Sequence, residues 1–119
     1  MARIMIADDS EAIRMVLKDI LEIGNHQLVS EAKDGIDAVE KFDLTKPDLV
    51  LMDFAMPKKD GKDALRDIIS KDPNAKVIMI TASDNLNTIN ECMEIGSRAF
   101  ILKPFDFNEV LKIIADVVA

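Results

Sequence analysis

Four short apolar runs in this chain each lead directly into a polar side chain. The runs are 4–7, 49–52, 77–80 and 99–102, and they lead into Asp8-Asp9, Asp53, Thr81 and Lys103. Runs of this length, rich in Ile and Val and separated by helix-like segments, are typical of buried parallel strands. The carboxyl ends of neighbouring parallel strands meet in one crevice, where ligands bind. The pattern therefore predicts an α/β fold whose chemistry lies at those ends.

The complete pattern predicts five strands that alternate with five helices. The expected strands are 3–8, 28–32, 48–53, 76–81 and 98–102. The expected helices start near residues 10, 37 and 62, at a cap on Ser83 or Asp84, and after Asp106. Such alternation implies a doubly wound parallel five-stranded sheet with helices on both faces, although periodicity alone does not give the strand order. The length of 119 residues predicts a single domain, 1–119. A closed eight-stranded barrel would need far more chain.

Composition narrows the classes of partner and the compartment. The formal net charge of −7 argues against a nucleic-acid or anionic-membrane surface. No apolar stretch approaches the roughly 20 residues that span a bilayer, and the N-terminus does not resemble a signal peptide. Cys92 is the only cysteine, which suits a reducing compartment. We therefore expect a cytoplasmic protein.

Asp53 and Lys103 are unusual because each charged group adjoins a run that should be buried. A buried carboxylate costs several kcal/mol unless it is paired or bound to a metal. Each charge alone has a simple explanation: Asp8-Asp9 could start a helix, and Lys103 could form a structural ion pair. Together, three acids against one lysine leave surplus negative charge, which a hard divalent cation relieves. Oxygen ligands favour Mg²⁺, with Mn²⁺ as an alternative.

A carboxylate beside such a cation can act as a nucleophile towards phosphorus and form an aspartyl phosphate. Transfer of the phosphoryl group then depends mainly on positioning and on neutralising its charge. The cation and Lys103 would supply positive charge, and the Thr81 hydroxyl would donate a hydrogen bond. The residues therefore predict a magnesium-assisted phosphoryl acceptor.

The same residues resemble those of the receiver (response-regulator) domain family, in particular the single-domain chemotaxis regulators of the CheY type. The resemblance rests on Asp8-Asp9, on 52–57 with Gly61, on Thr81-Ala82 and on 103–105. It implies a flavodoxin-like (βα)5 fold with strand order 2-1-3-4-5. It also implies roles for individual residues. Asp53 would be the phosphoacceptor, and the metal would be bound by Asp8, Asp9, Asp53 and the main-chain carbonyl of Ala55. Thr81 and Lys103 would contact the phosphate, and Thr81 and Phe100 would form the switch.

The resemblance further implies a stand-alone signalling switch rather than an enzyme. A histidine kinase of the CheA type would phosphorylate Asp53, with slow self-dephosphorylation afterwards. The phosphorylated monomer would bind a motor or adaptor protein through its fourth helix, fifth strand and fifth helix. The resemblance implies chemotaxis as the pathway.

Several alternatives remain open at this point. Within the family, the chain could be a phosphorelay intermediate or a receiver module excised from a larger regulator. Outside it, a small phosphatase with an aspartate nucleophile is the main rival, but enzymes of the haloacid dehalogenase type use Asp-x-Asp. Here Ala55 replaces the second acid of that motif. A flavodoxin-like electron carrier would need a hydroxyl-rich loop after the first strand, where this chain has acids.

Overall fold

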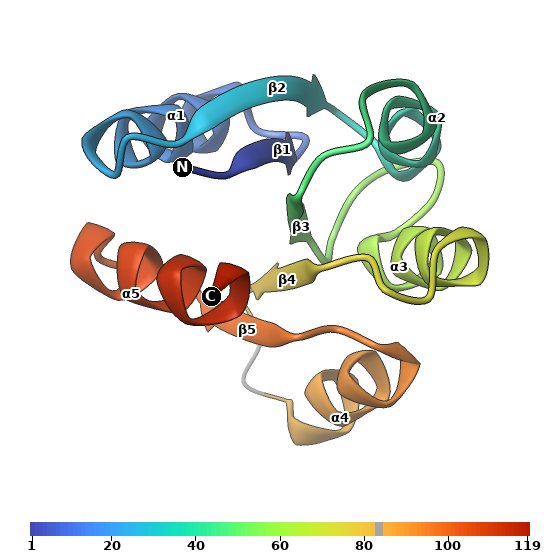
Figure 1. Ribbon diagram of the computed structural model, residues 1–119. Coiled ribbons are helices and arrows are strands. Elements are labelled where there is room, and N and C mark those ends of the chain that lie inside the picture. The colour runs from blue at the N-terminus through green and yellow to red at the C-terminus, as the bar shows by residue number, and fades with distance from the viewer. Residues whose placement is uncertain (83–84) are drawn as a thin grey trace.

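The computed structural model describes residues 1–82 and 85–119, in which five strands alternate with five helices (Figure 1). The strands are β1 (Arg3–Ala7), β2 (Gln27–Ala32), β3 (Leu49–Asp53), β4 (Val77–Thr81) and β5 (Ala99–Leu102). The helices are α1 (Glu11–Ile23), α2 (Gly35–Thr45), α3 (Gly61–Lys71), α4 (Leu86–Ile95) and α5 (Phe107–Val118). The predicted alternation is confirmed, and every strand bound lies within one residue of the expected position.

All five strands are parallel and lie in the order β2-β1-β3-β4-β5. The predicted α/β fold and its strand order are therefore confirmed. The sheet reverses its winding between β1 and β3, and ligands bind beside such a reversal in open α/β sheets. Among the residues that the structure describes, β5 pairs only with β4 and is therefore an edge strand.

The alternation of side chains along each strand divides the core into two layers. Met5 and Val50 face α2 and α3, whereas Ile4 and Leu51 face α1 and α5. Figure 1 shows the same division, with α1 and α5 on one side of the sheet and the other three helices opposite. Because both faces are covered, β3 and β4 are buried along their whole length.

Polar side chains cap the helices where the chain leaves each strand. Ser10 accepts a hydrogen bond from the backbone N–H of Ile13 at the start of α1, and Asp106 accepts one from that of Glu109 at the start of α5. The cap of α4 differs from the prediction. Ser83 and Asp84 lie outside the described residues, and the side chain of Asn85 accepts from the backbone N–H groups of the first turn. An amide oxygen at that position satisfies the same free donors as a hydroxyl or carboxylate.

Among residues 1–82 and 85–119, no helix has the length and apolar character needed to cross a membrane.

Candidate functional site

The strand register brings the predicted site residues together at the carboxyl ends of the strands. Ala7, the last residue of β1, lies beside Met52 on β3. The residues that follow them in the chain, Asp8 and Asp53, are therefore neighbours. Asp53 in turn pairs with Ile80, the residue before Thr81. Asp8, Asp53 and Thr81 are all at least 95% buried. The convergence predicted from the strand ends is therefore present in the structure.

Three carboxylates form a cluster at these strand ends. Asp8, Asp9 and Asp53 each offer one oxygen, and these three oxygens lie within 4.8 Å of one another. Lys103 reaches the cluster from the end of β5. Its Nζ lies 3.1 Å from Oδ1 of Asp53 and 3.3 Å from Oδ2 of Asp8. One ammonium thus faces three acids, and negative charge remains in surplus.

The electrostatics of the cluster follow from its burial. Burial and the neighbouring Asp8 carboxylate raise the pKa of Asp53 to about 6, although Lys103 opposes the shift. Burial disfavours the charge on Lys103, but Asp53 and Asp8 outweigh it and raise the pKa of that ammonium above its usual value. The carboxyl of Asp53 therefore ionises at an unusual cost, which additional positive charge would relieve.

Both the backbone and the side chain of Asp8 are held by hydrogen bonds. Its N–H donates to the carbonyl of Ala32 at 3.0 Å, which fixes the end of β1 against β2. Its Oδ1 accepts from the N–H of Ser10 at 2.8 Å, and its Oδ2 faces Lys103. Asp9 differs: it is exposed, and its carboxylate makes no hydrogen bond or ion pair with any residue that the structure describes.

The loop between β3 and α3 folds closely over the end of β3. The N–H of Gly61 donates to the carbonyl of Phe54 at 2.7 Å. A Cβ added to Gly61 would lie 2.1 Å from the carbonyl oxygen of Asp53, so only glycine fits there. Ala55 lies in this loop and is exposed. Its role as a main-chain metal ligand stays a prediction.

Thr81 and Phe100 line one small apolar recess between the sheet and α4. The other lining residues are Phe54, Met79, Thr88, Ile89, Cys92, Met93 and Ser97. Phe100 as a residue is 39% exposed, so it is only partly accessible to solvent. The free volume of the recess is about 10 Å³, far below the roughly 150 Å³ of a cavity that holds benzene. The two predicted switch residues therefore line the same recess, but the recess as it stands has no room for a second ring position.

Arg14 also contacts the site, and sequence reasoning did not identify it. Its Nη1 donates to the main-chain carbonyl of Asp8 at 2.7 Å from the first half of α1. A weak signal was available, because Arg14 lies three residues before the buried Leu17, next to the side of α1 that packs towards the sheet.

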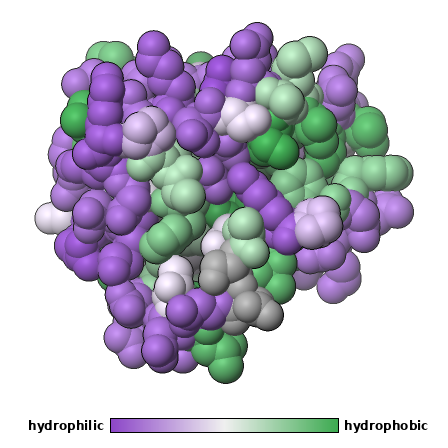
Figure 2. Space-filling view, turned by 180° about the vertical axis from the view of Figure 1, so that it is seen from behind, coloured by the Kyte–Doolittle hydropathy of each residue, from purple (hydrophilic) through white to green (hydrophobic). Residues whose placement is uncertain are grey.

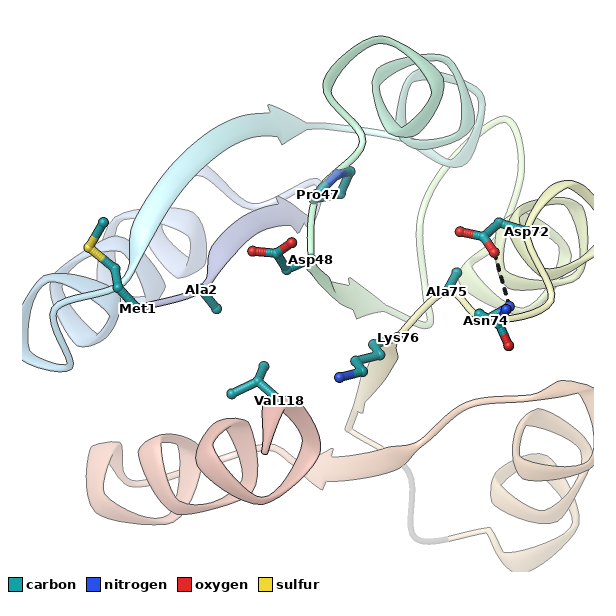
Figure 3. A pocket seen from close by; sticks show the side chains of 9 residues that line it. All are labelled: Met1, Ala2, Pro47, Asp48, Asp72, Asn74, Ala75, Lys76 and Val118. Atoms are coloured by element: carbon teal, nitrogen blue, oxygen red, sulfur yellow. Dashed lines mark hydrogen bonds between the residues drawn. The ribbon is translucent and has the colours of Figure 1, made fainter.

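A separate hollow of about 400 Å³ lies at the opposite end of the sheet, near the amino ends of β1, β3 and β4 (Figure 3). Ala2, Asp48 and Lys76 line it from the residues that precede these strands. Its two carboxylates, Asp48 and Asp72, accept backbone hydrogen bonds from Arg3 and Asn74. This hollow is shallow and polar, and none of the predicted site residues lies in it.

The acid cluster fits a hard divalent cation on three grounds. Its donors are all oxygens, it carries surplus negative charge, and two of its carboxylates are buried. Mg²⁺ in proteins is typically bound by one or two carboxylates and keeps several waters. The exposure of Asp9 leaves one side of the cluster accessible to such a hydrated ion.

Comparison with known proteins identifies the class. A family model described as the response regulator receiver domain matches residues 4–115, and the chain therefore belongs to the response regulator receiver family. It is 42% identical to protein CcdB of Bacillus subtilis over 117 residues, which cover 98% of each chain. It is 39% identical to chemotaxis protein CheY of Listeria monocytogenes over 112 residues, which cover 94% of each chain.

A solved structure agrees with this assignment. The chain is similar to a protein chain in the crystal structure of the CheX-CheY-BeF3-Mg²⁺ complex from Borrelia burgdorferi, with a TM-score of 0.96 and 34% sequence identity. The match covers 98% of this chain and 89% of that one. The chain is thus a CheY-like receiver domain, and receiver domains act as phosphoacceptor switches rather than ordinary enzymes.

Proposed function

We propose that the chain, as one receiver domain over residues 1–119, accepts a phosphoryl group on Asp53 from a histidine kinase and thereby changes its affinity for a partner protein. The observation that carries this proposal is the buried Asp53 carboxylate, which lies at the end of β3 between two further acids and Lys103. Membership of the receiver family and the CheY names of its relatives support chemotaxis as the pathway and a cytoplasmic location.

The transfer step requires Asp53 as a carboxylate. One of its oxygens forms a bond to phosphorus while the bond from phosphorus to the kinase histidine nitrogen breaks. The electron pair of that bond stays on the imidazole nitrogen, which takes a proton from solvent. Asp8, Asp9, Asp53 and the carbonyl of Ala55 would hold Mg²⁺ or Mn²⁺, which when bound neutralises charge on the phosphoryl oxygens. Lys103, which contacts Asp53 and Asp8, would supply further positive charge, and the Thr81 hydroxyl would donate a hydrogen bond to a phosphoryl oxygen.

The signal would pass from Asp53 through Thr81 to Phe100. A phosphoryl group adds negative charge and acceptor oxygens, which would draw the Thr81 hydroxyl towards Asp53. Because the recess behind Phe100 is too small for its ring, movement of Thr81 or α4 must precede any inward movement of the ring.

The exposure of Phe100 limits what its burial can contribute. Phe100 is 39% exposed as a residue, so with a total area of roughly 200 Å² its complete burial removes at most about 80 Å² from water, worth about 2 kcal/mol. A shift from 1:99 to 99:1 needs about 5.5 kcal/mol. The ring alone therefore does not drive the switch, and the contacts of the phosphoryl group must supply the larger share.

The partner, a motor or adaptor protein, would bind across α4, β5 and α5. Five large apolar side chains on these elements are exposed, namely Leu86, Met93, Phe100, Leu102 and Phe107. Figure 2 shows hydrophobic groups interrupting the hydrophilic surface on the back of the molecule. Exposed apolar side chains that gather on an edge strand and its flanking helices are typical of a docking surface.

Intact-mass measurement tests the acceptor. Acetyl phosphate with Mg²⁺ should add one phosphoryl group to the wild type and none to Asp53→Asn. Asp116→Asn, which removes a carboxylate from the exposed face of α5, should be modified like the wild type. Modification of Asp53→Asn would move the acceptor to another acid, and steady turnover of a phosphomonoester would favour the phosphatase alternative.

NMR with beryllofluoride, an aspartyl-phosphate mimic, tests the route of the signal. We expect amide shifts at Thr81 and in β5 and α4 as well as around Asp53. Shifts confined to Asp8, Asp9 and Asp53 would show that this chain does not signal through that face.

A further inference from the structure

Arg14 joins the ends of two neighbouring strands from a position on α1. Its Nη1 donates to the carbonyl oxygen of Asp8 at 2.7 Å, and its Nε donates to Oε1 of Glu31 on β2 at 3.2 Å. The Arg14 side chain is only 17% exposed and that of Glu31 is 32% exposed, so both contacts are partly sheltered from water. A guanidinium holds its donors in a rigid planar fork, which fixes two acceptors relative to each other.

The contact with Asp8 acts on the peptide that leads into Asp9. The carbonyl of Asp8 and the N–H of Asp9 belong to the same planar peptide unit. The N–H on the other side of Asp8 is already held by the carbonyl of Ala32. Arg14 therefore fixes the orientation of the plane from which the Asp9 side chain departs.

Asp9 depends on this backbone constraint more than the other two acids do. The carboxylates of Asp8 and Asp53 both contact Lys103, and Asp8 also accepts the N–H of Ser10. The exposed Asp9 carboxylate has no hydrogen bond or ion pair with the described residues. Its place within 4.8 Å of the other acids is thus set through its main chain.

We propose that Arg14 is a positioning residue that holds Asp9 in place to bind the divalent cation; this rests on the magnesium site of the proposed function. The positive charge of Arg14 by itself would weaken the binding of a cation nearby, because like charges repel. Positioning and charge therefore predict opposite effects when Arg14 is removed. The sign of the change in Mg²⁺ affinity separates them.

Lys18 offers a matched control that separates a positioning role of Arg14 from a purely structural one. Lys18, one turn further along α1, contacts the other oxygen of Glu31 at 2.8 Å. Lys18→Met removes one positive charge from α1 and one contact with Glu31, as Arg14→Met does. Of the two side chains, only that of Arg14 also reaches the carbonyl of Asp8. Arg14→Lys supplies the second comparison, because it keeps the charge and loses the planar fork.

The experiment is an NMR titration with MgCl2 at pH 7, with no phosphoryl donor present, in which amide shifts give the dissociation constant. We expect Arg14→Met and Arg14→Lys to raise that constant about tenfold, as is usual when the partners that orient metal ligands are lost. Lys18→Met should stay within twofold of the wild type. In phosphorylation by acetyl phosphate, Arg14→Lys should need about tenfold more Mg²⁺ for half-maximal rate and reach a similar maximal rate.

The outcomes that overturn the proposal are distinct from those that overturn the function. A folded Arg14→Lys protein with wild-type Mg²⁺ affinity, or an Arg14→Met protein that binds Mg²⁺ more tightly, would remove Arg14 from this role while the metal site stands. A wild-type protein in which MgCl2 leaves the amides around Asp8, Asp9 and Asp53 unshifted would remove the metal site itself, and the proposal with it. If Arg14→Met does not fold, the Arg14→Lys titration alone decides.

Discussion

The ammonium nitrogen of Lys103 lies 3.1 Å from Oδ1 of Asp53, and this contact is not sufficient to hold the pKa of that carboxyl in its usual range. Burial and the Asp8 carboxylate outweigh it and raise the pKa to about 6. Ionised Asp53 is therefore a destabilising group in the protein without metal.

This balance predicts how stability varies with pH in the absence of metal. The folded state binds the Asp53 proton more tightly than the unfolded chain does, whose pKa is about 3.9. The free energy of unfolding should therefore fall as pH rises from about 4 to about 7 through this group. Asp53→Asn, which cannot ionise, should be more stable than the wild type at pH 7 by about 1–3 kcal/mol, and the difference should shrink towards pH 4.

Urea unfolding followed by circular dichroism in EDTA measures this difference, since the chain has no Trp. Asp116→Asn, which removes an exposed carboxylate, should change stability by less than about 0.5 kcal/mol at any pH. A gap between Asp53→Asn and wild type that is the same at pH 4.5 and pH 7 would contradict the ionisation argument.

Magnesium should reverse the instability at neutral pH. A ligand that binds only the folded state at ten times its dissociation constant adds about 1.4 kcal/mol to the free energy of unfolding. We expect this gain in wild type at pH 7 and a smaller gain at pH 5, where Asp53 is mostly protonated. Asp9→Asn should lose most of it, whereas Asp19→Asn, which removes an exposed acid from α1, should retain it. Equal stabilisation of the two variants in thermal melts would exclude Asp9 as a ligand.

Gly61 should not tolerate a methyl group. In an ordinary first helical turn, alanine is favoured over glycine by up to about 1 kcal/mol. Here the added Cβ would lie 2.1 Å from the carbonyl oxygen of Asp53, so Gly61→Ala should destabilise the protein by about 2 kcal/mol or more. Asn108→Ala, in the exposed first turn of α5, should stay within about 0.5 kcal/mol. A stabilised Gly61→Ala protein would mean that the loop moves aside easily.

Cys92 should report on the recess that Phe100 covers. The thiol is buried, and burial raises its pKa, so little reactive thiolate exists at pH 8. Both residues line the recess. Phe100→Ala should therefore increase the rate of reaction with an aromatic disulfide reagent about tenfold or more. Phe107→Ala, which removes an exposed ring outside the recess, should leave the rate near that of wild type. Equal rates in the two variants would show that Phe100 does not shield the thiol.

The sequence predicted most of the fold and the composition of the site because both depend on where buried strands end. Asp53 and Thr81 were identifiable because a polar group follows an apolar run, and the parallel arrangement then brings such groups together. Strand order came from family resemblance, because apolar periodicity records burial and not which strand lies beside which.

Arg14 and Asn85 show where prediction stopped. The role of Arg14 depends on a contact between a helical side chain and a main-chain carbonyl six residues earlier, which no apolar pattern encodes. The cap of α4 at Asn85 depends on where the chain turns after β4, and several adjacent polar residues could serve equally well by composition. The partial exposure of Phe100 likewise depends on how α4 packs, so its magnitude could not be read from the residue type.

The site residues Asp8, Asp53, Thr81 and Lys103 each occupy the last position of a strand or the position directly after one. Their spacing is therefore set by the sheet register, whereas the connecting loops begin only beyond them. These four side chains would therefore keep their spacing when loop residues are exchanged, provided that Asp9, Ala55 and the close contact of Gly61 with Asp53 are retained. The same catalytic geometry could thus be combined with new loops and new partners, which makes the arrangement well suited to diversification and to engineering.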